Sequence, residues 1–180
     1  MTAFYKNIKG LVNVQNNFFQ RSSGGELITA IYPQNADFGT TKGFAFSLDV
    51  MNMSYFSVSA QYTYSVAEGT GSSTSSSQTA IFRNNDNEAP KVIAPLDFDQ
   101  RHTATVNVEF YVPEGQLGLL ERFNVNMLFS INSGRPYTPL DYWDIVTGND
   151  GGPSTTGYVN SRYGPGSFRM DLRVEKTFNI

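Results

Sequence analysis

The stretch Phe56-Ser57-Val58-Ser59-Ala60-Gln61-Tyr62-Thr63-Tyr64 decides the fold class, because apolar or aromatic residues alternate with polar residues along its whole length. Successive side chains of a β-strand point to opposite faces, so this alternation predicts a strand with two chemically different faces. One face suits lipid and the other suits water. No cluster of catalytic residues stands out from this pattern, and we expect a protein that is not an enzyme.

Four other segments alternate in the same way and predict further strands. They begin near residues 44, 101, 122 and 167, and a less regular first strand is expected over residues 2–14. Together these segments predict about six antiparallel strands. Their apolar positions are expected to form one lipid-facing surface, whose members are Phe44, Phe46, Val58, Tyr62, Val106, Phe110, Val125, Phe129, Phe168 and Leu172.

The connections between these strands are long and short by turns. Long polar stretches are expected at residues 15–25, 67–100 and 134–166, with 26–32 in a structured loop and 33–39 as a turn; short connections are expected near 52–54 and 113–121. Up-and-down barrels of bacterial outer membranes have short periplasmic turns and long outer loops. Soluble sandwiches have no reason to sort their connections in this way. The order of connections therefore favours an all-β transmembrane barrel.

Composition sets limits on the class of protein. The chain contains 14 Phe, 10 Tyr and 16 Gly, which favours strands and turns over helices. It lacks an apolar run near 20 residues, so a transmembrane helix is not expected. The net charge of -3 and the mixing of acidic and basic residues argue against a nucleic-acid partner, and the absence of cysteine excludes disulfides and thiolate metal sites.

The first residues, Met1 to Lys6, have neither a basic n-region nor an apolar h-region. A secretory signal is therefore not expected in this chain. We expect residues 1–180 to form a single partial barrel domain without a plug domain.

Several stretches resemble the C-terminal barrel region of TonB-dependent receptors, in particular the group that carries a carboxypeptidase-regulatory-like domain. The stretches are Ala3-Phe4-Tyr5-Lys6-Asn7-Ile8, Asp37-Phe38-Gly39-Thr40-Thr41-Lys42-Gly43-Phe44, Tyr62-Thr63-Tyr64-Ser65-Val66-Ala67-Glu68-Gly69, Pro95-Leu96-Asp97-Phe98-Asp99-Gln100-Arg101-His102, Ser133-Gly134-Arg135-Pro136-Tyr137-Thr138-Pro139 and Phe168-Arg169-Met170-Asp171-Leu172-Arg173-Val174-Glu175-Lys176-Thr177-Phe178. Their order and spacing cover most of the chain.

The resemblance implies a place in the cell outer membrane and the import of a nutrient ligand, with no cofactor. The family has a 22-stranded barrel filled by an N-terminal plug and receives energy from the inner membrane through TonB. This chain departs from that plan, since it has about six strands, no plug and no TonB box, whereas a closed membrane barrel needs about eight strands or more. We therefore expect a piece of a larger receptor barrel, with lipid as a partner and with TonB acting only through other parts of the parent protein.

Few residues are candidates for a binding site. Tyr137, Tyr142 and Trp143 follow a strand end, where they suit either ligand stacking or the aromatic girdle of a membrane interface. His102 lies beside Asp97 and Asp99, but a structural role at the rim of a strand is favoured over acid–base chemistry. A calcium site built from Asp86, Asp97 and Asp99 matches no known spacing, so no metal site is expected.

The last strand carries four alternating charges, Arg169, Asp171, Arg173 and Glu175, on its polar face. They are expected to pair with neighbouring strands or with a plug rather than to line a substrate path. Two other interpretations of the whole chain remain open: a soluble all-β binding module, for example for carbohydrate, and a small membrane barrel that closes by oligomerising. The position of the lipid-facing set distinguishes the soluble module, in which that set converges on a closed interior.

Overall fold

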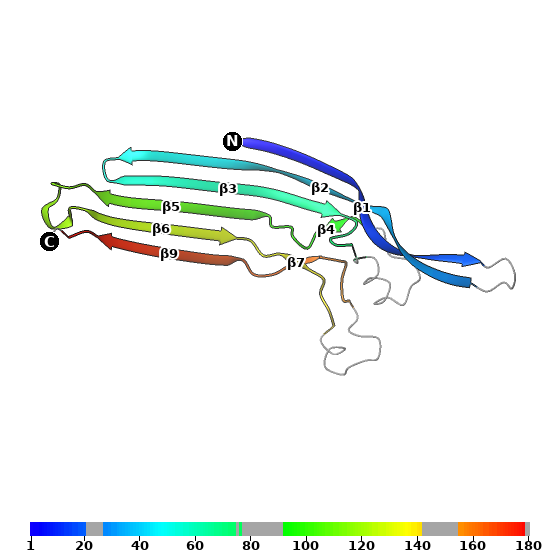
Figure 1. The fold of residues 1–180 in the computed structure, drawn as a ribbon. Coiled ribbons are helices and arrows are strands. Elements are labelled where there is room, and N and C mark those ends of the chain that lie inside the picture. The colour runs from blue at the N-terminus through cyan, green and yellow to red at the C-terminus, as the bar shows by residue number, and fades with distance from the viewer. Residues whose placement is uncertain (21–26, 75, 77–91, 142–154, 179–180) are drawn as a thin grey trace.

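The computed structural model describes residues 1–20, 27–74, 76, 92–141 and 155–178. Six long strands lie side by side in the order β1-β2-β3-β5-β6-β9, and every neighbouring pair is antiparallel (Figure 1). The strands are β1 (Thr2–Gln20), β2 (Leu27–Met53), β3 (Phe56–Gly69), β5 (His102–Val112), β6 (Phe123–Asn132) and β9 (Ser167–Lys176). The prediction of an all-β antiparallel fold is confirmed.

Among the described residues, three short strands and one 3-10 turn lie outside this row. The two-residue strand β4 (Ala94–Pro95) pairs with the end of β3, and β7 (Pro136–Tyr137) pairs with β8 (Arg162–Tyr163) in a separate two-stranded sheet. A single 3-10 turn, η1 (Gly118–Leu120), lies between β5 and β6. None of the described residues forms a helix with the length and apolar character of a membrane span.

The strand register places the ten predicted apolar residues on one face of the sheet. Residues that lie opposite each other in antiparallel strands point to the same side. Phe46 lies opposite Tyr62, Val58 opposite Val108, Val106 opposite Phe129, and Ile131 opposite Phe168. The alternation that the sequence predicts is therefore continuous across β2, β3, β5, β6 and β9.

Over most of the length of these five strands, the charged residues are segregated by the same register. From Phe44 to Val50, from Phe56 to Tyr64 and through β5, β6 and β9 as far as Val174, the apolar face carries no Asp, Glu, Lys or Arg. The opposite face carries Asp49, Glu109, Arg169, Asp171, Arg173 and Glu175. Within these bounds one face carries no formal charge and the other is rich in charge, and Lys42, Glu68 and Lys176 lie on the apolar face beyond them, toward its two ends.

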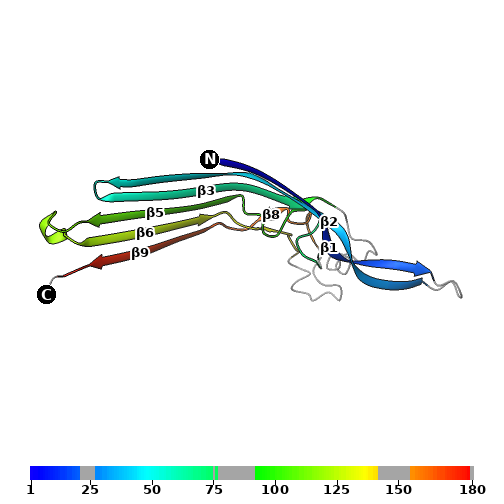
Figure 2. The same cartoon turned by 45° about the horizontal axis from the view of Figure 1, so that its top comes forward.

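The apolar face is not covered by a second layer of described structure, and the row of strands stays open in both views (Figures 1 and 2). The chain exposes 12643 Å², whereas a compact 20.0 kDa protein exposes about 8,700 Å². Among the described residues the buried apolar side chains are Val66, Ala67, Leu96 and Val112. The predicted lipid-facing set does not converge on a closed interior.

Aromatic rings gather at the two ends of the apolar face. Toward the end with the long connections, Phe44, Tyr62, Tyr64 and His102 lie ring to ring, with centroids 5.2–6.2 Å apart. Toward the opposite end, Phe110 contacts the rings of Tyr55, Phe56 and Phe123. The residues between the two groups on β3 and β5 are smaller, namely Val58, Ala60, Ala104, Val106 and Val108.

The first hairpin is longer than the sequence predicts. Residues 15–20 and 27–32 were expected in loops and 33–39 in a turn, yet all three ranges lie in strands, and β1 pairs with β2 from Thr2 to Gln20 (Figure 1). The expectation failed because residues 27–38 of β2 pair with β1 only. A strand that is paired on one side tolerates Pro33, which has no backbone N–H to donate, and also tolerates polar residues. A bulge at Gly10, whose φ is +72°, interrupts the register just before this extension.

The predicted sorting of connections is confirmed after β2, β3, β5 and β6, but the long connection expected after the first strand is wrong, because β1 extends to Gln20 and only residues 21–26 separate it from β2. The short connections after β2 and β5 lie at the same end of the sheet, and those after β1, β3 and β6 lie at the other (Figure 1). Ser54 forms the tight turn after β2 with a left-handed φ of 58°. The end with the long connections is called the loop end below.

Candidate functional site

A buried carboxylate at the loop end joins three segments that are distant in sequence. Asp99 is 1% exposed and accepts hydrogen bonds from the Ala67 backbone N–H (2.7 Å), from Arg101 Nε (2.7 Å) and from the Tyr163 hydroxyl (2.8 Å). The Arg101 guanidinium also donates to the Tyr163 oxygen and lies over its ring. The Asp99 knot, comprising Asp99, Arg101 and Tyr163, thus ties the end of β3 and the start of β5 to β8.

Asn160 makes a second link beside the Asp99 knot. Its side-chain amide donates to the Pro95 carbonyl and to the Asp97 carboxylate, both at 2.7 Å, and its backbone N–H donates to the Thr138 hydroxyl. Asn160 is 5% exposed. Segments 92–101 and 158–163 are therefore joined by side-chain hydrogen bonds, whereas segments 136–138 and 158–163 also share the pairing of β7 with β8.

His102 does not take part in the Asp99 knot. Its Nδ1 shares a 2.8 Å hydrogen bond with the Tyr62 hydroxyl, and its ring packs on Tyr62 and Tyr64. Asp99 is saturated by three donors, and Asp97 is bonded to Asn160. No acid–base pair of Asp and His is formed, which agrees with the structural role that the sequence favours for these residues.

The Asp99 knot changes the acidity of two of its members. Burial disfavours the charged form of Arg101, but hydrogen bonds to Asp99 and Tyr163 and the attraction of the Asp99 carboxylate outweigh it, so the pKa of Arg101 is raised. Burial, followed by the hydrogen bond to Asp99, raises the pKa of Tyr163 above its ordinary value of 10.0. The knot therefore favours a charged guanidinium and a neutral phenol.

The raised pKa of Tyr163 predicts a pH dependence of stability. A group whose pKa is higher in the folded protein stabilises the fold below its unfolded pKa, and this contribution is lost as the pH rises through the folded value. We expect the difference in urea midpoint between the wild-type chain and Tyr163→Phe to be constant from about pH 7 to about pH 9 and to shrink above about pH 10. Circular dichroism of the chain in detergent micelles measures both midpoints.

Tyr158→Phe is the matched control, because the Tyr158 side chain is 84% exposed. This variant is expected to follow the wild-type midpoint at every pH. If the difference in urea midpoint between the wild-type chain and Tyr163→Phe does not change with pH, the folded protein does not favour the neutral phenol of Tyr163.

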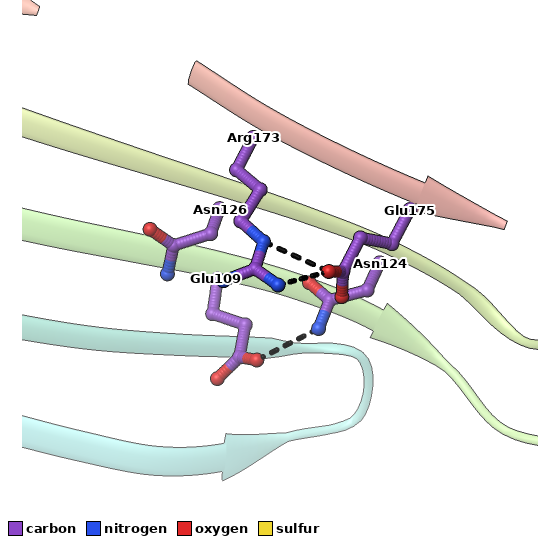
Figure 3. Close-up of a pocket in the computed structure, with 5 residues that line it drawn as sticks. All are labelled: Glu109, Asn124, Asn126, Arg173 and Glu175. Atoms are coloured by element: carbon purple, nitrogen blue, oxygen red, sulfur yellow. Dashed lines mark hydrogen bonds and ion pairs between the residues drawn. The ribbon is translucent and has the colours of Figure 1, made fainter. Parts of the chain in front are cut away.

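A second polar site lies on the charged face near the short connections. A hollow of about 300 Å³ is lined by Glu109 of β5, Asn124 and Asn126 of β6, and Arg173 and Glu175 of β9 (Figure 3). Arg173 Nε donates to Glu175 at 2.8 Å, and the Asn124 amide donates to Glu109 at 3.1 Å. The buried Asn124 Oδ1 has no hydrogen-bond partner among the described residues. The hollow offers groups that can bind hydroxyls, amides or a cation.

The alternating charges of β9 pair within the strand rather than with its neighbours. Arg169 contacts Asp171 at 2.9 Å, and Arg173 contacts Glu175. The sequence predicted partners on adjacent strands or on a plug. Residues i and i+2 of a strand lie on one face, and β6 offers only Asn124, Asn126, Leu128 and Ser130 there, so the long Arg side chains reach the acids of their own strand.

The predicted ligand-binding residues are only partly described. Tyr137 lies in β7 at the loop end and is 50% exposed, whereas Tyr142 and Trp143 lie outside the described residues. Asp86 of the rejected calcium site also lies outside them. Within the described ranges, no three His, Cys, Asp or Glu side chains gather in a way that could hold a metal ion.

Sequence reasoning did not find Tyr163 or Asn160 as partners of the segment that contains Asp97 and Asp99. These partners are 60 or more positions apart in sequence, and both lie in the long connection between β6 and β9, whose path is not set by the periodicity of the long strands. The hollow was equally unforeseen, although the alternation of β5, β6 and β9 already placed its five residues on polar faces.

No protein-family model, no curated protein and no solved structure matches this chain.

Proposed function

We propose that this chain supplies six neighbouring strands to the wall of an outer-membrane β-barrel, in a receptor of the TonB-dependent kind that imports a nutrient. The observation that carries the proposal is the uncovered, uncharged apolar face that spans five strands, opposite a face that holds their charges. Large exposed apolar surfaces are unfavourable in water and mark interaction or membrane sites. In a barrel wall, this face contacts lipid and the charged face lines the lumen.

Strand length and aromatic positions support the same proposal. A transmembrane β-strand needs about 9–11 residues, and β5, β6 and β9 have 11, 10 and 10 residues. Barrels of this class carry aromatic girdles at both membrane interfaces. The ring groups around Tyr62 and Phe110 lie at the corresponding two ends of the apolar face.

The open edges of the sheet argue for a larger barrel. Among the described strands, β1 and β9 each pair on one side only. An unsatisfied backbone group in lipid costs several kcal/mol, so both edges need further strands before the wall is closed. Barrels of the proposed kind have more strands than these six. In such a barrel the loop end, which includes Tyr137, faces outward and takes part in ligand capture. The partners are lipid, a nutrient ligand and, through other parts of the parent protein, TonB.

Cysteine scanning along β5 tests the proposal, because the chain contains no cysteine of its own. β5 is paired on both sides, so its residues differ only in the face to which they point. Ala104→Cys, Val106→Cys and Val108→Cys are labelled with a fluorophore in lipid vesicles. We expect quenching by nitroxides on lipid tails at these three positions, because they face the bilayer.

Thr103→Cys, Thr105→Cys and Asn107→Cys are the matched controls on the opposite face. They are expected to respond to aqueous iodide and not to lipid nitroxides. A quenching pattern without a period of two, or a monodisperse, cooperatively folding chain in plain buffer, would overturn the barrel proposal. The second of these outcomes would favour a soluble all-β binding module.

A further inference from the structure

A buried oxygen cluster lies at the base of the projecting β1–β2 hairpin and shares no residue with either site described above. Asn13 is fully buried, and its amide nitrogen contacts Asp37 Oδ2 and, at 3.0 Å, Ser76 Oγ. The second Asp37 oxygen accepts a 2.9 Å hydrogen bond from the Thr70 hydroxyl. The cluster, defined as Asn13, Asp37, Thr70 and Ser76, joins the hairpin to the segment that follows β3.

Two polar groups of this cluster lack a partner that would offset the cost of their burial. Asp37 is 7% exposed, yet its carboxylate forms no ion pair with a described Lys, Arg or His. Asn13 Oδ1 is buried and has no hydrogen-bond partner among the described residues. Buried charges are normally paired or bound to a metal ion, and a buried unsatisfied acceptor costs about 1–3 kcal/mol. A bound cation would satisfy both the carboxylate and the amide oxygen.

The geometry suits a cation shared by side-chain oxygens. The nitrogen and oxygen of an amide have nearly the same shape, so a half-turn of the Asn13 amide places its oxygen beside the oxygens of Asp37 and Ser76. Without a cation these oxygens repel each other, and with one they become ligands. Gly71 leaves this space open, because a Cβ there would clash with the Asp37 carboxylate and the Ser76 hydroxyl.

We propose that this cluster is a Ca²⁺ site that locks the β1–β2 hairpin onto Thr70 and Ser76, which follow β3. Ca²⁺ accepts carboxylate, amide and hydroxyl oxygens in irregular arrangements, whereas Mg²⁺ demands a regular octahedron. The site has one carboxylate, and sites with few charged ligands in extracellular modules bind with dissociation constants of about 10⁻⁴–10⁻³ M. The inference goes beyond the proposed function and does not depend on it, since the cluster lies beyond the apolar face.

Calorimetric titration of the full chain in detergent micelles with CaCl₂ tests the site. We expect one Ca²⁺ per chain, together with a higher urea midpoint in CaCl₂ than in EGTA at equal ionic strength. MgCl₂ is expected to give a much smaller shift. Asp37→Asn keeps the shape of the side chain and removes its charge, so it is expected to weaken Ca²⁺ binding at least tenfold and to abolish the shift in midpoint.

Asn13→Asp separates the cation site from an ordinary buried hydrogen-bond cluster. A second carboxylate tightens a cation site, so this variant is expected to bind Ca²⁺ about tenfold more tightly and to be destabilised only in EGTA. Asp49→Asn, whose partner is Ser59 on the charged face, is the control and should bind like the wild type. Three results would each overturn the proposal: no Ca²⁺ binding by the wild type, the same Ca²⁺-dependent shift in urea midpoint in Asp37→Asn as in the wild type, or a loss of stability in Asn13→Asp that Ca²⁺ does not relieve. None of these results alters the β5 quenching pattern.

Discussion

Replacement of Asp99 by alanine is expected to destabilise the folded chain by about 3–5 kcal/mol, the cost of removing one partner from a buried ion pair. The Asp99 side chain is fully buried and binds Arg101 at 2.7 Å. Its loss also leaves the Ala67 N–H and the Tyr163 hydroxyl without their acceptor. Urea titration of the chain in detergent micelles, followed by circular dichroism, measures the change.

The Asp99→Ala variant should also lose local order at the loop end. The knot is the link between β8 and the start of β5, so segments 92–101 and 155–166 are expected to become sensitive to protease before the long strands do. Limited proteolysis with mass spectrometry locates the cuts.

Asp171→Ala is the matched control for Asp99→Ala. Asp171 also pairs with an arginine two positions away, but its side chain is 46% exposed, and exposed pairs contribute about 0–1 kcal/mol. If Asp99→Ala and Asp171→Ala lower the free energy of unfolding equally, burial does not determine how much the Asp99 knot stabilises the chain.

Placing an arginine on the apolar face should be the second most damaging change. Val106 lies in the middle of β5, opposite Ala60 on one side and Phe129 on the other. In a membrane barrel, Val106→Arg puts a charge near the bilayer midplane and is expected to cost about 2–4 kcal/mol. Urea titration in phospholipid vesicles gives this free energy.

Thr105→Arg is the control, because Thr105 is the adjacent residue on the charged face. It is expected to change stability by less than about 1 kcal/mol, since the lumen of a barrel hydrates the guanidinium. If Val106→Arg is tolerated as well as Thr105→Arg, the apolar face does not contact lipid and the barrel proposal fails.

Strand periodicity carried most of the fold prediction. The five alternating segments became β2, β3, β5, β6 and β9, because a strand has only two faces and a shift of one residue would reverse all its side chains. Prediction failed at residues 15–20 and 27–39, where the pairing of β1 with β2 outweighs the polar residues and Pro33. Backbone hydrogen bonding between two strands is not visible in the periodicity of either one.

The candidate sites were predicted less well than the strands. The sequence drew attention to Asp97, Asp99 and His102 because they are neighbours along the chain, yet the structure separates them. Asp99 binds Arg101 and Tyr163, Asp97 binds Asn160, and His102 binds Tyr62. Which neighbour each side chain meets depends on the paths of long loops, and these paths have no repeating pattern.

The sequence by itself determined the all-β class and the two chemically different faces, because these are properties of a local repeat of two residues. Only the tertiary structure decided the strand register that joins five apolar stripes into one uncharged face. It also decided the contacts of Asp99 with Tyr163 and of Asn13 with Asp37. Such contacts join residues that are 24 or more positions apart, and their geometry is fixed only when the connecting chain has folded.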